Sequence, residues 1–83
     1  MEVLLFASLA RSFGGGSVRI QDGPATAGEV IERLKAMAGP QFHSDLAGVT
    51  ILLNGRNVEF LDGLATRVTP GDTITLIPPV AGG

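Results

Sequence analysis

One stretch of this chain has the spacing of a long amphipathic helix, and that limits the folds open to it. Thr26 and Glu29 form the T-x-x-E pattern in which each side chain can bond the other residue's backbone N–H, so a helix should begin near Ala27. Gly39 and Pro40 should end it. Apolar residues recur at three- and four-residue steps within it, namely Val30, Ile31, Leu34, Met37 and Ala38. In a chain of 83 residues, a single helix of this kind must cover a sheet made by the remaining segments.

Short apolar runs on both sides of this helix predict the strands. They occupy residues 1–9, 17–21, 49–53, 57–60 and 73–77. Asn54-Gly55 predicts a hairpin turn, and Pro70-Gly71 fits the two central positions of a type II turn. The predicted fold is therefore α+β, a roll in which one main helix crosses one face of a mixed sheet. Another small α+β fold with the same elements is the alternative.

Length and composition exclude several classes of protein. The chain fits one domain, predicted over residues 1–77, with a flexible C-terminal tail at residues 78–83. The absence of cysteine excludes disulfides, thiolate metal sites and cysteine nucleophiles. A formal net charge of −2 argues against a nucleic-acid partner. The apolar runs are too short for a membrane helix, so we expect no membrane partner and a cytoplasmic location.

No set of side chains predicts catalysis or metal binding. The single histidine, His43, lies next to Ser44 and Asp45 in a predicted polar connection. Consecutive residues seldom converge on one substrate, which favours a surface histidine in a loop over a catalytic triad. No group of His, Asp and Glu has the spacing of metal ligands. The glycines at 14–16 precede a strand and lack the lysine of a phosphate-binding loop, so they predict a turn.

The last six residues, Pro78-Pro79-Val80-Ala81-Gly82-Gly83, are the most unusual feature of the sequence. The prolines favour a stiff, extended base, whereas the terminal glycines are slim enough to enter a narrow channel. The only reactive group there is the α-carboxylate of Gly83, and a carboxylate is a poor electrophile. Another enzyme must therefore activate Gly83 as an acyl-phosphate or acyl-adenylate. The residues thus predict a protein that works through its terminus and has no catalytic side chains of its own.

The ending resembles that of a known family. The run from Leu76 to Gly83, the turn Pro70-Gly71-Asp72 and the opening segment Val3–Ala7 resemble the MoaD/ThiS family of ubiquitin-like sulfur carriers, and most of all the small subunit of molybdopterin synthase. The resemblance covers essentially the whole chain and implies a β-grasp fold. Arg11 lies where the family often has an arginine, although Ser12 replaces the acidic residue that commonly follows.

The resemblance implies a cycle of sulfur transfer. An E1-like adenylating enzyme would use ATP to activate the Gly83 carboxylate, and a sulfur donor protein would convert it to a thiocarboxylate. The loaded tail would then enter the large subunit of molybdopterin synthase, which supplies the catalytic side chains, and the chain itself would bind no cofactor. Gly82 would give access to the channel, and the rest of the tail would line the docking site: Pro78, Pro79, Val80 and Ala81. Leu4, Phe6 and Ile77 are predicted to point away from the helix and to form an apolar docking patch.

Three other functions remain open at this point. The sulfur acceptor could instead belong to the synthesis of thiamin thiazole, cysteine or another sulfur metabolite. The chain could be a protein modifier that is joined to lysines through an isopeptide bond. It could also be a binding module with an inert tail.

Overall fold

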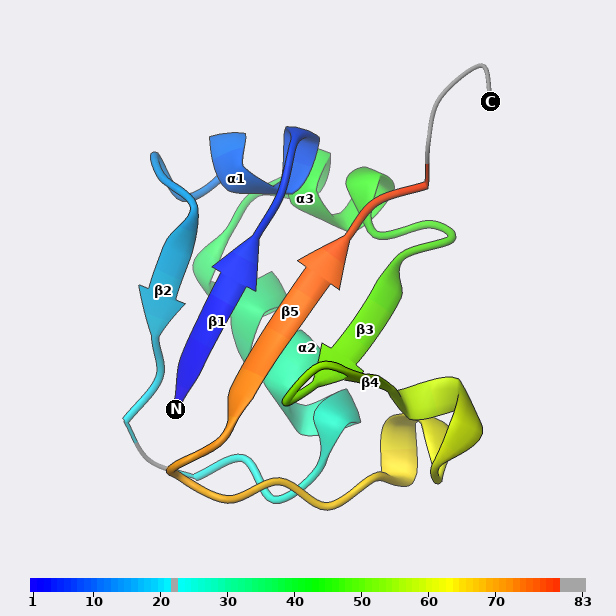
Figure 1. The fold of residues 1–83 in the computed structure, drawn as a ribbon. Helices are drawn as coiled ribbons and strands as arrows, with labels where there is room; N and C mark the ends of the chain where they lie inside the picture. The colour runs from blue at the N-terminus through cyan, green and yellow to red at the C-terminus, as the bar shows by residue number, and fades with distance from the viewer. Residues whose placement is uncertain (22, 80–83) are drawn as a thin grey trace.

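The computed structural model describes residues 1–21 and 23–79, and these form one layer of strands covered by helices (Figure 1). In chain order the elements are β1 (Glu2–Leu5), α1 (Ser8–Arg11), β2 (Ser17–Arg19), α2 (Ala27–Met37), α3 (Pro40–Asp45), β3 (Thr50–Leu53), β4 (Arg56–Asn57), the 3-10 helices η1 (Val58–Phe60) and η2 (Gly63–Ala65), and β5 (Thr73–Ile77). The strands pair in the order β2-β1-β5-β3-β4.

The first and last strands lie side by side at the centre of the sheet. β1 and β5 are parallel, and all the other pairs are antiparallel. Thr75 on β5 lies opposite Leu4 on β1 and opposite Leu52 on β3, so these three side chains form a row across one face. The chain crosses from β2 at one edge of the sheet to β3 on the far side of β5, and α2 lies in this connection.

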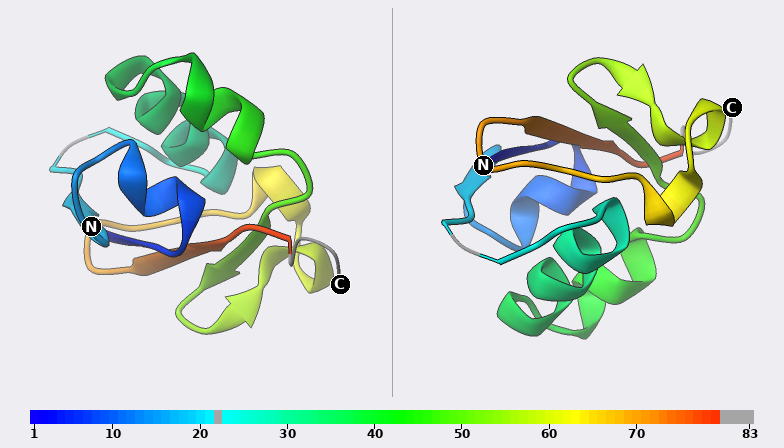
Figure 2. Two further views of the ribbon diagram at one scale, coloured as in Figure 1. Left: turned by 90° about the horizontal axis from the view of Figure 1, so that it is seen from above. Right: turned by 90° about the horizontal axis from the view of Figure 1, so that it is seen from below.

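The hydrophobic core lies between α2 and one face of the sheet. Figure 2 shows α2 and α3 on the same side of the strands. Val30 and Leu34 on α2 are completely buried, as are Val3 on β1 and the alternate residues Ile74 and Leu76 on β5. This arrangement confirms the predicted α+β roll, a mixed sheet crossed by one main helix as in the β-grasp fold.

The ends of α2 lie where the sequence predicts them. The Glu29 N–H donates to Thr26 Oγ1 at 3.2 Å, which confirms half of the predicted reciprocal cap. The Glu29 carboxylate accepts from the Ala25 N–H instead of the Thr26 N–H. Met37 is 54% exposed, so its place in the apolar stripe was wrong. The stripe ends at Leu34, and Ala38 packs only partly against the core.

The first predicted strand is shorter than the expected residues 1–9. It ends at Leu5, and Ala7 has a φ of 52°, which turns the chain into α1. Leu9 is completely buried, and it lies on this helix and not on a strand. Ala7, which lies within the expected strand and has the odd-numbered position of the buried Val3 and Leu5, is exposed. Because odd-numbered residues from Met1 to Leu9 are mostly apolar, the alternating pattern could not show where the strand stops.

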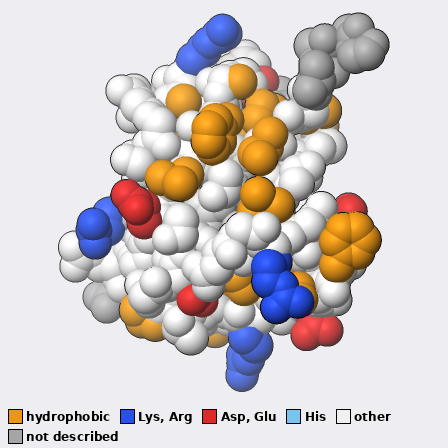
Figure 3. All heavy atoms as spheres, viewed as in Figure 1, with side chains coloured by type: hydrophobic (Ala, Val, Ile, Leu, Met, Phe, Trp, Pro, Cys, Tyr) orange, Lys and Arg blue, Asp and Glu red, His pale blue; other side chains and the backbone are white. Residues whose placement is uncertain are grey.

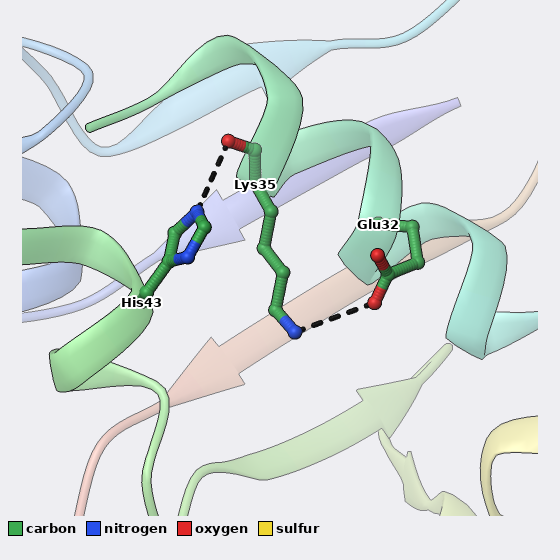
Figure 4. Close-up of polar contacts among 3 residues, drawn as sticks. All are labelled: Glu32, Lys35 and His43. Atoms are coloured by element: carbon green, nitrogen blue, oxygen red, sulfur yellow. Dashed lines mark hydrogen bonds and ion pairs between the residues drawn. The ribbon is translucent and has the colours of Figure 1, made fainter. Parts of the chain in front are cut away.

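The connection predicted after α2 is in fact a second helix, α3. Pro40 occupies its first turn, where a missing N–H costs nothing. Phe42 is completely buried and meets Phe13 edge to face, with ring centroids 5.2 Å apart. His43 therefore lies on a helix and not in a loop. Its Nε2 is 3.3 Å from the carbonyl oxygen of Lys35 in the last turn of α2, and Lys35 also pairs with Glu32 on its own helix (Figure 4).

Two turns position the remaining strands. Asn54 and Gly55 both have positive φ, 49° and 86°, as the predicted hairpin requires. The return strand is only Arg56–Asn57, because the chain then enters η1; the strand expected over 57–60 is thus mostly wrong. The Asp72 N–H donates to Thr69 O at 3.0 Å, which confirms the turn at 69–72. Gly71 is not among the glycines with positive φ, so the turn is not type II.

Candidate functional site: the base of the C-terminal tail and its docking face

The end of β5 fixes where the tail leaves the molecule. β5 is held between β1 and β3 and ends at Ile77, because Pro78 and Pro79 have no N–H to continue the ladder. Pro79 then packs against Gly48 in the loop before β3. The contact is close, because a Cβ added to Gly48 would lie 3.3 Å from the Cγ of Pro79. The base of the tail, residues 78–79, is therefore held at the end of the central strand β5. Val80, Ala81, Gly82 and Gly83, all predicted site residues, lie outside the described residues.

A groove lies along one side of this base. It has a volume of about 470 Å³ and is bounded by the turn after β1, by α1 and by the end of β5. Its lining residues are Phe6, Ala7, Ser8, Arg11, Ile77, Pro78 and Pro79. The positive φ of Ala7 makes the groove, because it swings α1 across the end of the sheet. Ala7 and Ser8 were not among the predicted site residues, because the predicted strand ran through both positions.

The three residues predicted as a docking patch lie on the face of the sheet that α2 does not cover. Val3 and Leu5 are buried on the face of the sheet that α2 covers, whereas Leu4 between them is half-buried on the opposite face. Phe6 is 51% and Ile77 38% exposed. The structure thus brings Leu4, Phe6 and Ile77 to one face. Figure 3 shows a cluster of hydrophobic side chains on the upper half of this face, with charged side chains mostly over its lower half and at its edges.

Leu52 belongs to the same apolar surface, although it was not among the predicted residues. It lies in the row Leu4, Thr75, Leu52 across the sheet and is half-buried. The signal that could have found it is alternation in β3, where Leu52 follows the buried Ile51. The uniformly apolar run Ile51–Leu53 hid that alternation. We define the docking face as Leu4, Phe6, Leu52 and Ile77 together with the groove residues.

Arg11 is the charged side chain of the groove. It lies on α1, is exposed, and has no ion pair within the described part of the chain, where the salt bridge is that between Lys35 and Glu32. A cation beside apolar walls favours a partner surface that combines apolar side chains with a carboxylate.

The described residues contain no evident catalytic or metal-binding group. The side chains of Ser44 and Asp45 make no hydrogen bond to the His43 ring. The Asp45 carboxylate instead accepts a hydrogen bond from the Gln41 side-chain amide on α3. Within residues 1–21 and 23–79, His, Asp and Glu do not gather in threes as metal ligands would. In the same residues, none of the helices has the length and apolar character needed to cross a membrane.

One carboxylate is electrostatically distinct, and its role is structural. The Asn54 side-chain amide donates to Asp72 Oδ1 at 2.9 Å, and the Thr69 N–H donates to Oδ2 at 2.7 Å. These bonds favour the ionised form and lower the pKa of Asp72 below its ordinary value. The residue lies at the start of β5, at the opposite end of this strand from the tail.

Comparison with known proteins identifies the family. The model of the ThiS family matches residues 3–83. Small archaeal modifier protein 3 of Haloferax volcanii is 36% identical over 96 residues, which cover all of this chain and 98% of the relative. The sulfur carrier protein CysO of Mycobacterium bovis is 33% identical and covers 92% of this chain and 91% of its own.

Solved structures agree. The crystal structure of SAMP1 from Haloferax volcanii has a TM-score of 0.80 and 32% identity, and covers 99% of this chain and 97% of its own. The BexX/CysO complex from Amycolatopsis orientalis contains a chain with a TM-score of 0.76 and 29% identity, with 99% and 98% covered. None of the proteins named here is a molybdopterin synthase subunit, so the narrower resemblance stays a proposal. The chain belongs to the ThiS family of ubiquitin-like sulfur carriers and small archaeal modifiers.

Proposed function

We propose that this protein carries sulfur as a thiocarboxylate on Gly83, with Gly83 as the terminal residue. The observation that carries the proposal is the position of the tail base: β5 places Pro78 and Pro79 at the end of an apolar sheet face that no helix within residues 1–21 and 23–79 covers. The described residues offer no catalytic set of their own. A carrier needs this combination, because its partners must grip the domain while their own side chains act on the tail.

The chemistry requires two partners. A carboxylate oxygen of Gly83 attacks the α-phosphate of ATP on an E1-like adenylating enzyme, and pyrophosphate leaves. Sulfur from a donor protein, at the oxidation level of sulfide, then attacks the acyl carbon and displaces AMP. The products are the thiocarboxylate and AMP. ATP is thus a substrate of the activating enzyme, and the carrier itself holds no cofactor.

The geometry supports delivery of the terminus into an enclosed site. Residues 80–83 follow a base that Gly48 and the end of β5 hold in place, and four extended residues span about 13 Å. A partner can therefore cover the docking face while the terminal carboxylate reaches well beyond it. Phe6 and Ile77 are the exposed apolar side chains that such a partner would cover first.

The acceptor of the sulfur is the finer part of this proposal. The molybdopterin precursor held by the large synthase subunit is one acceptor, and precursors of thiamin thiazole, cysteine or another sulfur metabolite are the others. The relationship to CysO carriers favours the second group over molybdopterin. Co-purification of the tagged chain from its own cells separates them, since recovery of a molybdopterin synthase large subunit would assign the first.

Mass spectrometry of the intact protein tests the carrier chemistry. The chain is incubated with an E1-like enzyme that is shown to be active, with ATP and with a sulfur donor. We expect one carboxyl oxygen to be replaced by sulfur at Gly83. The matched control is a chain that ends at Ala81, which should remain folded and unmodified. If the full chain keeps its original mass while the same enzyme loads its own carrier, the proposal is wrong.

Protein modification is the second candidate, and the relationship to small archaeal modifiers favours it. The same acyl-adenylate would be attacked by a lysine amine, which forms an isopeptide bond and releases AMP. Trypsin cuts this chain for the last time after Arg67, so digestion of cellular proteins should then leave residues 68–83 attached to the modified lysines. A strain whose carrier ends at Ala81 provides the control, and equal remnant levels in both strains would exclude this candidate.

A further inference from the structure

A second hollow lies on the other side of the tail base from the groove. It has a volume of about 340 Å³ and is bounded by the loop before β3, by β3 itself and by the 3-10 helices η1 and η2. The side chains of its wall are mainly aliphatic: Leu46, Val49, Ile51, Val58 and Leu64. Leu64 is 59% exposed, so part of this wall faces solvent. The hollow is large enough for one apolar side chain of a partner.

This hollow is continuous with the base of the tail. Gly48 lines the hollow, and Pro79 packs directly on Gly48. Pro79 in turn lines the groove that contains Phe6 and Ile77. The tail thus leaves the molecule between two concave surfaces, and an enzyme that surrounds residue 79 must meet both.

The two hollows carry opposite charges. Arg11 lines the groove, whereas Glu59 lines the hollow beside β3. The backbone of Glu59 is fixed, because its N–H donates to Asn57 Oδ1 at 2.9 Å. Within the described residues its carboxylate has no ion pair, since the salt bridge there joins Lys35 and Glu32. An apolar pocket with a carboxylate at its rim is complementary to an apolar side chain that has a cation beside it.

We propose that this hollow is a second docking surface for the enzyme that takes the tail. Its occupant is an apolar side chain of that enzyme, with a lysine or arginine next to it that faces Glu59. Opposite charges on the two sides of the tail base fix the rotation of the carrier about its tail, because a reversed partner would place like charges together. This inference rests on the proposed function.

The charge of the hollow also distinguishes among occupants. The chain's own tail would bring the Gly83 carboxylate toward Glu59, and two carboxylates repel each other. A second copy could offer its own Arg11 and groove to the hollow, but this head-to-tail contact would cover the groove beside the tail base of that copy and so compete with the enzyme that takes the tail. A cationic rim on a partner enzyme has neither difficulty.

Steady-state kinetics of adenylation test the inference. ATP–pyrophosphate exchange by the E1-like enzyme is measured as the concentration of the carrier is varied. Glu59→Lys should raise the KM for the carrier about tenfold and leave kcat unchanged, because a rim charge acts on encounter and not on the chemical step. Glu59→Gln should have a smaller effect, and added salt should narrow the difference between wild type and Glu59→Lys. Leu64→Ala should also raise KM, because it removes an apolar wall.

The matched control is Glu32→Lys, which changes the net charge by the same amount on the helical side of the molecule. A KM for Glu59→Lys equal to that for Glu32→Lys would overturn the inference and leave the carrier function intact. A wild-type chain that supports no exchange with an active enzyme would overturn the proposed function, and this inference with it. A dimer in sedimentation experiments that Leu64→Ala dissociates would assign the hollow to a second copy and also overturn it. Melting curves of every variant show whether a change in KM reflects unfolding.

Discussion

Asp72 and Asn54 show how single side chains hold the sheet together. The Asn54 side chain donates to Asp72 and accepts from the Thr73 N–H at 2.9 Å, so it joins the β3–β4 turn to the start of β5. Asp72 closes its own turn through the Thr69 N–H. The network explains why Asn54 and Asp72 serve the fold more than the function.

The lowered pKa of Asp72 predicts a dependence of stability on pH. A carboxylate whose folded pKa is below its unfolded value stabilises the native state above the unfolded pKa, and this contribution is lost as the pH falls through the folded pKa. Asp72→Asn should therefore lower the free energy of unfolding near neutral pH and have little effect once both states are protonated. Because solvent screens this accessible group, we expect at most about 1 kcal/mol.

Urea unfolding of Asp72→Asn and of wild type at a series of pH values measures the effect. Asp62→Asn is the control, because the Asp62 side chain, at the start of η2, makes no capping hydrogen bond. A difference from wild type that stays constant across the acid range would contradict the assignment of the effect to ionised Asp72.

At the scale of elements, α2 is the part that holds the sheet in shape. Its buried face covers β1 and β5, the two strands that set the exit of the tail. Where α2 begins, Gly28 allows η2 to approach closely, since a Cβ there would lie 3.2 Å from the carbonyl oxygen of Leu64. Damage to this helix should therefore affect the whole fold.

A pair of substitutions on α2 tests this. Leu34→Ala removes a completely buried side chain and should lower the free energy of unfolding by about 2–5 kcal/mol. Met37→Ala, one turn later on the same helix, should change it by less than about 0.5 kcal/mol, because Met37 is mostly exposed. Chemical unfolding followed by circular dichroism gives both values. Equal costs for the two changes would mean that the helix packs on a different face.

At the scale of the molecule, the proposed function assigns different roles to the domain and to its tail. Every buried apolar residue of the described chain lies between Met1 and Leu76, so the described core is complete before the tail begins. The domain presents the docking face, and the tail carries the reacting group in the proposed function. The two can then be changed independently.

Truncation after Pro79 should separate stability from activity. We expect the truncated chain to melt at the same temperature as the full chain, since no described core contact is removed, and to accept no sulfur. Differential scanning calorimetry and the loading assay measure the two properties. A large fall in melting temperature would show that residues 80–83 contribute to the folded domain.

The sequence alone determined the elements whose signals are local. The α2 cap at Thr26, the hairpin at Asn54-Gly55 and the alternation of β5 depend on residues within a few positions of each other, so their pattern was sufficient. The prediction that Leu4, Phe6 and Ile77 share a face followed from the same alternation. Family membership followed from the combination of the proline-rich, Gly-Gly ending with the order of elements.

Tertiary structure alone decided the features that depend on distant contacts. Leu9 and Phe42 are apolar residues whose burial is set by packing between α1 and α3, so sequence patterns assigned one to a strand and the other to a loop. The groove exists because Ala7 adopts a positive φ, and the hollow because Gly48 and η2 lie beside the start of β3. Surfaces of this kind arise where segments far apart in the chain come together, and no local pattern records which segments those are.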